Sequence, residues 1–169
     1  LKDAEDLFAA ALLQDMAIPL LAKELPEQYA ELLNSRQGGQ VRLSNLEQER
    51  FGWNHADAGA EMARGWSLPE EFATLIQAHA DLERTTAGRQ EEPGPFSVAV
   101  SALLPSAADE IWHERAQFEE IFAGAVTDTS PAELFSQIDE QYAEFAPVLK
   151  VSTAGKTLAE YLSEEAVAV

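Results

Sequence analysis

Apolar residues recur at spacings of three and four along most of the chain, which is the period of an amphipathic α-helix. The first such run contains Leu7, Phe8, Ala11 and Leu12. We expect these residues to form one buried helix face, and we expect Pro19 to end or bend the helix. Residues 26–36 predict a second helix, which Gly38 and Gly39 end. Strand signals are nearly absent, so the pattern predicts an all-α fold, a compact multi-helix bundle with no significant sheet.

Three serine–glutamate pairs have the spacing of a capping box and predict further helix starts. The pairs are Ser44 with Glu47, Ser67 with Glu70, and Ser130 with Glu133. In a capping box the serine oxygen accepts from a backbone amide three residues on, while the glutamate accepts from the serine amide. Pro131 strengthens the third pair, because proline is favoured at the first helical position. Asn54 is expected to cap a helix that starts with His55.

The chain also predicts an internal division. Residues 82–95 are rich in glycine, proline, threonine and charged side chains, which is typical of a long exposed loop. This loop separates a helical core, residues 1–81, from residues 96–169, whose helices complete or flank the same domain. Residues 96–113 predict one helix that Pro105 interrupts.

Charge narrows the classes of function. The 169 residues include 11 Lys and Arg against 30 Asp and Glu, which gives a net charge of −19. Such a surface repels nucleic-acid backbones and anionic membranes, so neither is an expected partner. Cysteine is absent, and the longest apolar run is far shorter than a membrane span. We expect a cytoplasmic protein. The chain opens at Leu1 in the middle of a helical pattern, and we expect it to be part of a longer protein.

Two histidines and one aspartate are the candidates for chemistry. His79 repeats the spacing of apolar residues on its own helix, and His55 lies in a helical first turn. Asp15 follows Phe8 and Leu12 on one face and is also expected to point inward. An inward aspartate with two inward histidines could bind a divalent metal ion. Spacing alone favours a structural role, because buried polar groups usually bond to one another or to the backbone.

Several segments resemble the HDOD domain, a divergent and generally non-catalytic relative of the HD and HD-GYP phosphohydrolases found in bacterial signalling proteins. The segments are Ala11-Leu12-Leu13-Gln14-Asp15-Met16-Ala17, Phe51-Gly52-Trp53-Asn54-His55-Ala56-Asp57-Ala58-Gly59, Trp66-Ser67-Leu68-Pro69-Glu70-Glu71 and Ala78-His79-Ala80-Asp81. The resemblance covers about residues 7–81 and implies an HD-like helical bundle. The chain resembles the C-terminal portion of an HDOD protein.

Departures from the catalytic pattern lead to the expected function. Gln14 stands where the motif has a histidine, and a neutral amide is a poor metal ligand beside an imidazole. Ala80 stands where HD-GYP relatives have the second histidine of a pair. The resemblance therefore implies a degenerate metal site, with Asp15, His55 and His79 as vestigial candidates. No catalytic residue, no cofactor-binding residue and no cofactor are predicted.

The predicted function is a non-catalytic regulatory module of bacterial signal transduction that acts through protein–protein interaction. Phe51, Trp53 and Trp66 are expected to be core anchors. Expected partners are a protein with a basic surface and the missing N-terminal portion of the same protein. A core cut short would expose apolar surface and favour a homodimer. Two alternatives stay open: a metal-dependent phosphohydrolase acting on a nucleotide or cyclic dinucleotide, and a ligand-sensing domain without hydrolysis.

Overall fold

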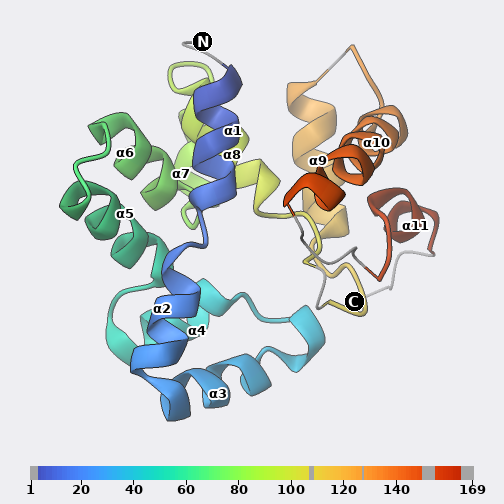
Figure 1. The fold of residues 1–169 in the computed structure, drawn as a ribbon. Coiled ribbons are helices and arrows are strands. Elements are labelled where there is room, and N and C mark those ends of the chain that lie inside the picture. The colour runs from blue at the N-terminus through green and yellow to red at the C-terminus, as the bar shows by residue number, and fades with distance from the viewer. Residues whose placement is uncertain (1–3, 107–108, 127, 150–154, 165–169) are drawn as a thin grey trace. The chain divides into compact units, whose positions relative to one another are not determined.

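The computed structural model describes residues 4–106, 109–126, 128–149 and 155–164. Within these ranges every regular element is a helix and no strand occurs, which confirms the predicted all-α class (Figure 1). None of these helices has the length and apolar character needed to cross a membrane. The chain divides into two compact units, Leu1–Ala102 and Leu103–Val169, and each is described by itself.

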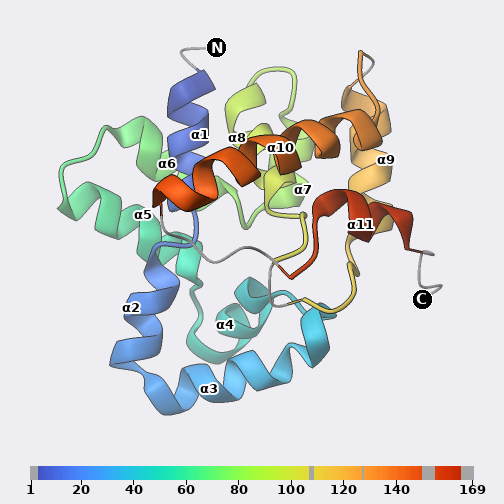
Figure 2. The same cartoon turned by 45° about the vertical axis from the view of Figure 1, so that its right-hand side comes forward.

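The first unit contains two groups of helices. Its elements are α1 (Ala4–Leu13), α2 (Ala17–Glu24), α3 (Pro26–Ser35), the short 3-10 helix η1 (Gln37–Gly39), α4 (Leu43–Phe51), α5 (His55–Gly65), α6 (Glu70–Ala78), α7 (Leu82–Ala87) and α8 (Pro93–Ser101). Helices α5 and α6 pack against each other, and α1 and α8 pack on α6 (Figure 1). Helices α2, α3 and α4 form the second group, joined to the first where α2 contacts α5 (Figure 2).

Small residues let α5 and α6 approach closely. Their shared cluster is fully buried and consists of Ala60, Ala63, Ala73 and Ile76. A Cβ atom added to Gly59 would lie 3.0 Å from Cγ2 of Ile76, closer than ordinary carbon contacts allow. A separate cluster of Tyr29, Leu32 and Leu43 holds the α2–α4 group together. A further buried cluster of Ala10, Leu75 and Val98 lies where α1, α6 and α8 meet.

Two of the three predicted capping boxes are wrong. Helix α4 begins at Leu43, so Ser44 already lies inside it, and Glu47 is fully buried. Ser67 lies three residues before α6 and adopts a φ of 59°, while Glu70 pairs with Arg64. In both cases the glutamate that was expected to cap its own helix instead contacts a residue of another helix.

The other predicted helix starts are confirmed. Oδ1 of Asn54 accepts from the amides of Ala56 and Asp57 at 2.9 and 3.2 Å, and the carboxylate of Asp57 accepts from the Asn54 amide. Ser130 and Glu133 form the third box in the second unit, where Ser130 Oγ accepts from the Glu133 amide at 3.2 Å.

The expectation of a long exposed loop over residues 82–95 is wrong, because this segment contains α7 and the start of α8. The Asp81 carboxylate accepts from the Arg84 amide at 3.1 Å and starts α7. Pro93 occupies the first turn of α8, where a missing amide hydrogen costs nothing. Helix α8 ends at Ser101, before Pro105, so residues 96–113 are not one helix. Residues 96–102 belong to the first unit.

The expected direction of some large apolar side chains is also wrong. Phe8 and Leu12 are each 66% exposed, although Leu7 of the same predicted face packs against a buried cluster. Trp66 is 62% exposed, because Leu68 takes the inward position against the α5–α6 cluster. Trp53 is half-buried and stacks on Phe51 at 5.0 Å between ring centroids.

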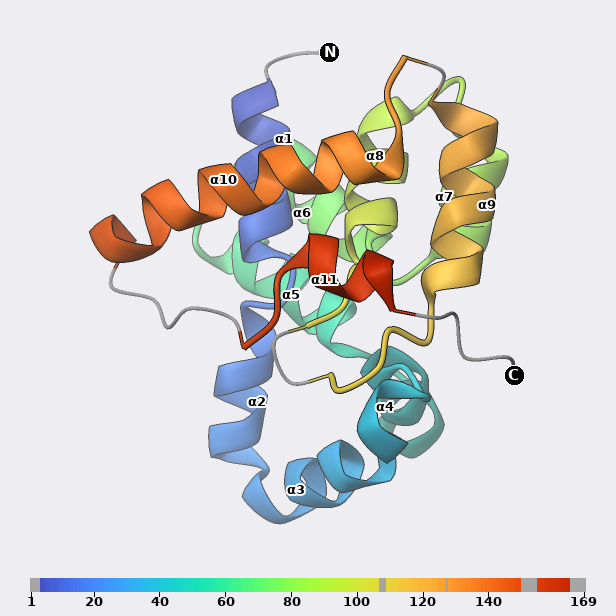
Figure 3. The same cartoon turned by 90° about the vertical axis from the view of Figure 1, so that its right-hand side faces the viewer.

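The second unit has an aromatic core. Its helices are α9 (Arg115–Ala125), α10 (Pro131–Leu149) and α11 (Leu158–Ser163), and α11 packs beside α10 (Figure 3). The rings of Trp112, Phe118 and Phe135 lie 5.4–5.6 Å apart between centroids. The indole Nε1 of Trp112 donates to the Leu103 carbonyl at 2.8 Å, so this buried ring is fixed at its polar end as well.

Candidate functional site

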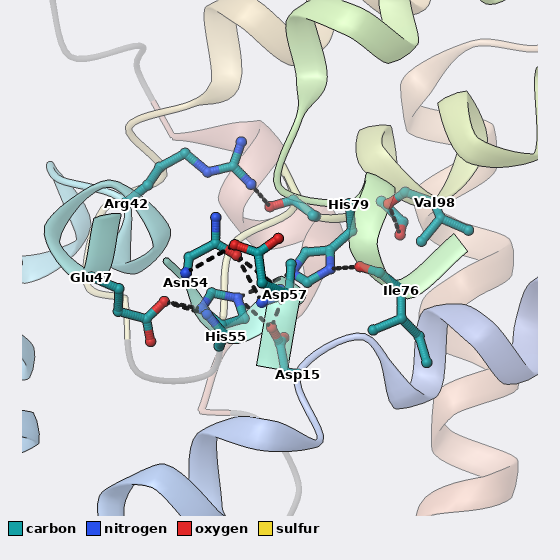
Figure 4. A network of polar contacts seen from close by, with 12 residues as sticks. Asp15, Arg42, Glu47, Asn54, His55, Asp57, Ile76, His79 and Val98 are labelled. Carbon is teal, nitrogen blue, oxygen red and sulfur yellow. Dashed lines mark hydrogen bonds and ion pairs between the residues drawn. The ribbon is translucent and has the colours of Figure 1, made fainter. Parts of the chain in front are cut away.

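The three candidate residues come together in the first unit. Asp15 lies in the turn between α1 and α2, His55 is the first residue of α5, and His79 follows α6 (Figure 4). Nε2 of His55 lies 3.0 Å from Nε2 of His79. Oδ1 of Asp15 lies 3.3 Å from Nε2 of His55 and 3.6 Å from Nε2 of His79. One carboxylate oxygen and two imidazole nitrogens therefore converge on one point.

The ring of His79 is fixed from its far side. Its Nδ1 lies 2.6 Å from the Ile76 carbonyl oxygen, one turn earlier in the chain. A carbonyl oxygen only accepts, so Nδ1 carries a proton and donates it. The side chain is buried, and the Nε2 of a neutral His79 therefore presents a lone pair to His55.

The ring of His55 is fixed by Glu47 of α4. Oε2 of Glu47 accepts from both the backbone amide and Nδ1 of His55, at 2.8 and 2.5 Å. Oε1 of the same carboxylate accepts from the Tyr29 hydroxyl at 2.5 Å. With Nδ1 held in this way, Nε2 of His55 points at His79 and Asp15. Both histidines thus have the hydrogen-bonded outer nitrogen that is usual for metal-binding imidazoles.

Asp15 is less buried than the sequence predicts. Its side chain is 56% exposed, so it forms the open edge of the cluster. The expectation that it shares a helix face with Phe8 and Leu12 is wrong, because Asp15 lies beyond the end of α1. Helix α1 ends at Leu13, and the turn that follows brings the carboxylate back toward the histidines.

Electrostatics distinguish the two imidazoles. Burial disfavours the charged form of His55, but hydrogen bonds to Asp15 and Glu47 and their negative charges outweigh it and raise the pKa of His55 to about 9. Burial lowers the pKa of His79, and the positive charge of His55 adds to this effect. Partial desolvation favours a higher pKa of Asp15, but the hydrogen bond and charge of His55 outweigh it and lower this pKa. At neutral pH the site holds a charged His55, a neutral His79 and an ionised Asp15.

The same three atoms have the spacing needed to bind one metal ion. A circle through atoms 3.0, 3.3 and 3.6 Å apart has a radius of about 1.9 Å, close to the ~2.1 Å of metal–nitrogen and metal–oxygen bonds. Two histidines and one carboxylate form a known ligand set for divalent transition metals. Such an ion would have to displace the Nε2 proton of His55.

Gln14 adds no charge to this ligand set. Its Oε1 is buried and has no hydrogen-bond partner within the described residues. Unpaired buried acceptors usually carry a cost of about 1–3 kcal/mol. A neutral amide remains a poor ligand for a divalent cation in the place where a histidine is expected.

Sequence reasoning missed Glu47, the residue that holds His55. A signal for it was present, because Glu47 follows Leu43 by four residues and precedes Phe51 by four, which places it on the buried face of α4. The capping-box interpretation of Ser44 concealed that signal. Nothing in the spacing of Tyr29 identified the contact of its hydroxyl with Glu47.

The fold and site define a helical domain with a buried His–His pair, an aspartate at its edge and a glutamate behind it. Residues 1–82 match the HDOD domain. This part of the chain, which includes Asp15, Glu47, His55 and His79, belongs to the HDOD domain family. No curated protein and no solved structure matches the chain.

Proposed function

We propose that this chain is a non-catalytic regulatory module of bacterial signal transduction that acts through protein–protein interaction. One observation carries the proposal: Nε2 of His55 lies 3.0 Å from Nε2 of His79 and 3.3 Å from Asp15. A charged His55 can donate from Nε2 toward these two groups and from Nδ1 to Glu47. The proton of His55 thereby supplies the positive charge that a bound metal ion would otherwise supply.

The ligand set also supports a role without hydrolysis. Metal-dependent phosphohydrolases use the ion to activate water and to stabilise charge on the phosphoryl group. Asp15, His55 and His79 offer three ligand atoms, and Gln14 offers only a neutral amide in the motif position. The carboxylate of Glu47 is already bonded to Tyr29 and His55.

The surface supports a protein partner. The net charge of −19 favours a partner with a basic surface, because complementary charges speed the encounter. Exposed Phe8, Leu12 and Trp66 supply apolar contact area on the first unit. Association with such a partner should slow as ionic strength rises, since screening acts on exposed charges. Sedimentation of the protein alone tests whether a second copy is the partner.

Hydrolysis assays on the whole chain test the non-catalytic proposal. The protein is incubated with Mn²⁺ or Mg²⁺ and a mononucleotide or cyclic dinucleotide, beside Asp15→Ala and His55→Ala. We expect the same background rate for all three proteins. Metal-dependent turnover by the original chain that both substitutions abolish would overturn the proposal.

A metal-dependent phosphohydrolase is the second candidate, and the converging atoms of Asp15, His55 and His79 favour it. These three residues would hold the ion, which would supply an activated water. The candidate requires about one equivalent of Mn, Fe or Zn in the purified protein, lost after Asp15→Ala. Metal content well below one equivalent, together with no turnover in added metal, would remove it.

A further inference from the structure

Glu47 is a fully buried carboxylate that joins two helices to the histidine pair. Oε1 accepts from the Tyr29 hydroxyl of α3, and Oε2 accepts from the amide and Nδ1 of His55 at the start of α5. Figure 4 shows the Glu47 carboxylate directed at the His55 ring, with His79 on the other side of that ring. These contacts form one continuous line from Tyr29 through Glu47 and His55 to His79.

The line is energetically significant because Glu47 is shielded from water. An ionised carboxylate in a protein interior costs several kcal/mol unless it is paired and hydrogen-bonded. The Tyr29 hydroxyl, the His55 amide and the His55 ring supply those bonds. A change that draws Tyr29 away removes one of them and alters the acceptor that holds the His55 ring.

His79 cannot adjust freely to such a change. Its Nδ1 donates to the Ile76 carbonyl at 2.6 Å, so a rotation of the ring would break that bond. Its Nε2 is left to interact with Nε2 of His55 at 3.0 Å. A movement of the His55 ring therefore changes the environment of His79 directly.

The line also connects two hydrophobic clusters that are otherwise distinct. Tyr29 packs with Leu32 and Leu43 in the α2–α4 group, while Ile76 belongs to the cluster between α5 and α6. Apolar packing within each group is short-ranged. A buried polar line between the groups supplies a more specific coupling than apolar packing alone.

We propose that Glu47 is the positioning residue of this site, and that the line Tyr29–Glu47–His55 transmits the position of α3 to the His55–His79 pair. Glu47 keeps Nδ1 of His55 protonated and Nε2 directed at His79. The inference deepens the proposed regulatory function and rests on it. It makes the His55–His79 pair sensitive to the position of α3, which supplies Tyr29.

Nitrogen-15 NMR of the histidine rings in the full chain tests the proposal, because imidazole resonances report which nitrogen carries a proton. Glu47→Gln keeps the shape of the side chain but removes its charge. Tyr29→Phe removes only the hydroxyl. Tyr161→Phe is the matched control, since Tyr161 is also buried and its hydroxyl donates to the Asp109 carbonyl in the second unit.

We expect Glu47→Gln to shift the resonances of both His55 and His79, and Tyr29→Phe to cause a smaller shift at both rings. Tyr161→Phe should leave both rings unchanged. Unchanged His79 resonances in Glu47→Gln, or equal shifts in Tyr29→Phe and Tyr161→Phe, would overturn the proposal. If Glu47→Gln does not fold, the two tyrosine variants decide the result.

The outcome of the NMR experiment is independent of the hydrolysis assay that tests the proposed function. Metal-dependent hydrolysis by the original chain would overturn the non-catalytic role, whatever the NMR spectra show. Absence of hydrolysis together with unchanged His79 resonances would leave that role in place and remove the coupling through Glu47.

Discussion

Gly59 offers a sharp test of the close contact between α5 and α6. It lies one turn after His55, and a Cβ atom at this position would meet Cγ2 of Ile76 at 3.0 Å. Ile76 is fully buried, so its side chain has no open space into which to retreat. Gly59→Ala therefore forces the two helices apart or strains a rotamer. Overpacking of this kind costs about 1–3 kcal/mol.

The gain in helix propensity works in the opposite direction. Alanine is better than glycine in a helix interior by about 1 kcal/mol, which would hide part of the overpacking cost of Gly59→Ala. Gly65→Ala, at the end of the same helix, is the matched control because nothing lies within 4 Å of its added Cβ atom. Because Gly65 is the last residue of α5, its substitution gains less helix propensity, so the difference between the two variants is a lower bound on the cost of the contact with Ile76.

Urea unfolding followed by far-UV circular dichroism measures that difference. We expect a lower midpoint for Gly59→Ala than for Gly65→Ala at equal slope. The same substitution should also widen the 3.0 Å separation of His55 and His79 and shift their imidazole resonances. A midpoint for Gly59→Ala equal to or above that of Gly65→Ala would refute the reasoning.

Three further outcomes follow from the structure. The pKa of His55 is raised to about 9, so its contribution to the unfolding free energy is complete below about pH 6.5 and is lost as pH rises through 9, by at most about 3 kcal/mol. In urea unfolding at several pH values, His55→Gln should flatten this dependence of the unfolding free energy on pH. An unchanged pH dependence in that variant would contradict the prediction. Trp66→Ala should change the unfolding free energy by less than about 0.5 kcal/mol, and a loss of several kcal/mol would show that Trp66 is buried. Ser130→Ala should destabilise the second unit by about 1 kcal/mol, because it removes the cap on the Glu133 amide. Ser136 is exposed in the same helix, and Ser136→Ala should not destabilise the unit. Equal effects of the two substitutions in thermal unfolding would refute the capping role of Ser130.

The parts of the fold that depend only on residues close together in the sequence could be predicted from it. The all-α class follows from helical periodicity, and the start of α5 follows from Asn54, whose side chain accepts from amides two and three residues away. Spacing marked Asp15, His55 and His79 as inward-facing candidates, but their meeting at one site was implied by the resemblance to a family, because three different segments supply them. Spacing places residues on a common helix face, but it does not decide which face is inward.

Helix α1 illustrates that limit. Phe8 and Leu12 are exposed, whereas Ala10 is fully buried against neighbouring helices. Close packing with α6 and α8 selects the small side chain, as it does at Gly59. The side-chain size that fits a contact between two helices is set by the partner helix. Hydrophobicity along one segment therefore predicts the wrong buried face when the contact requires a residue as small as alanine.

Glu47 sets a second limit, and it also indicates where a regulatory role would reside. A glutamate three residues after a serine can cap its own helix or turn inward, and the local sequence permits both. The choice is made by Tyr29 and His55, which are 18 and 8 residues away in the chain. Once inward, the carboxylate requires both partners, so its stability depends on α3 and α5 together. A group with that dependence responds to displacement of either helix, which makes Glu47 better placed than the exposed Asp15 to connect a partner's binding with the histidine pair.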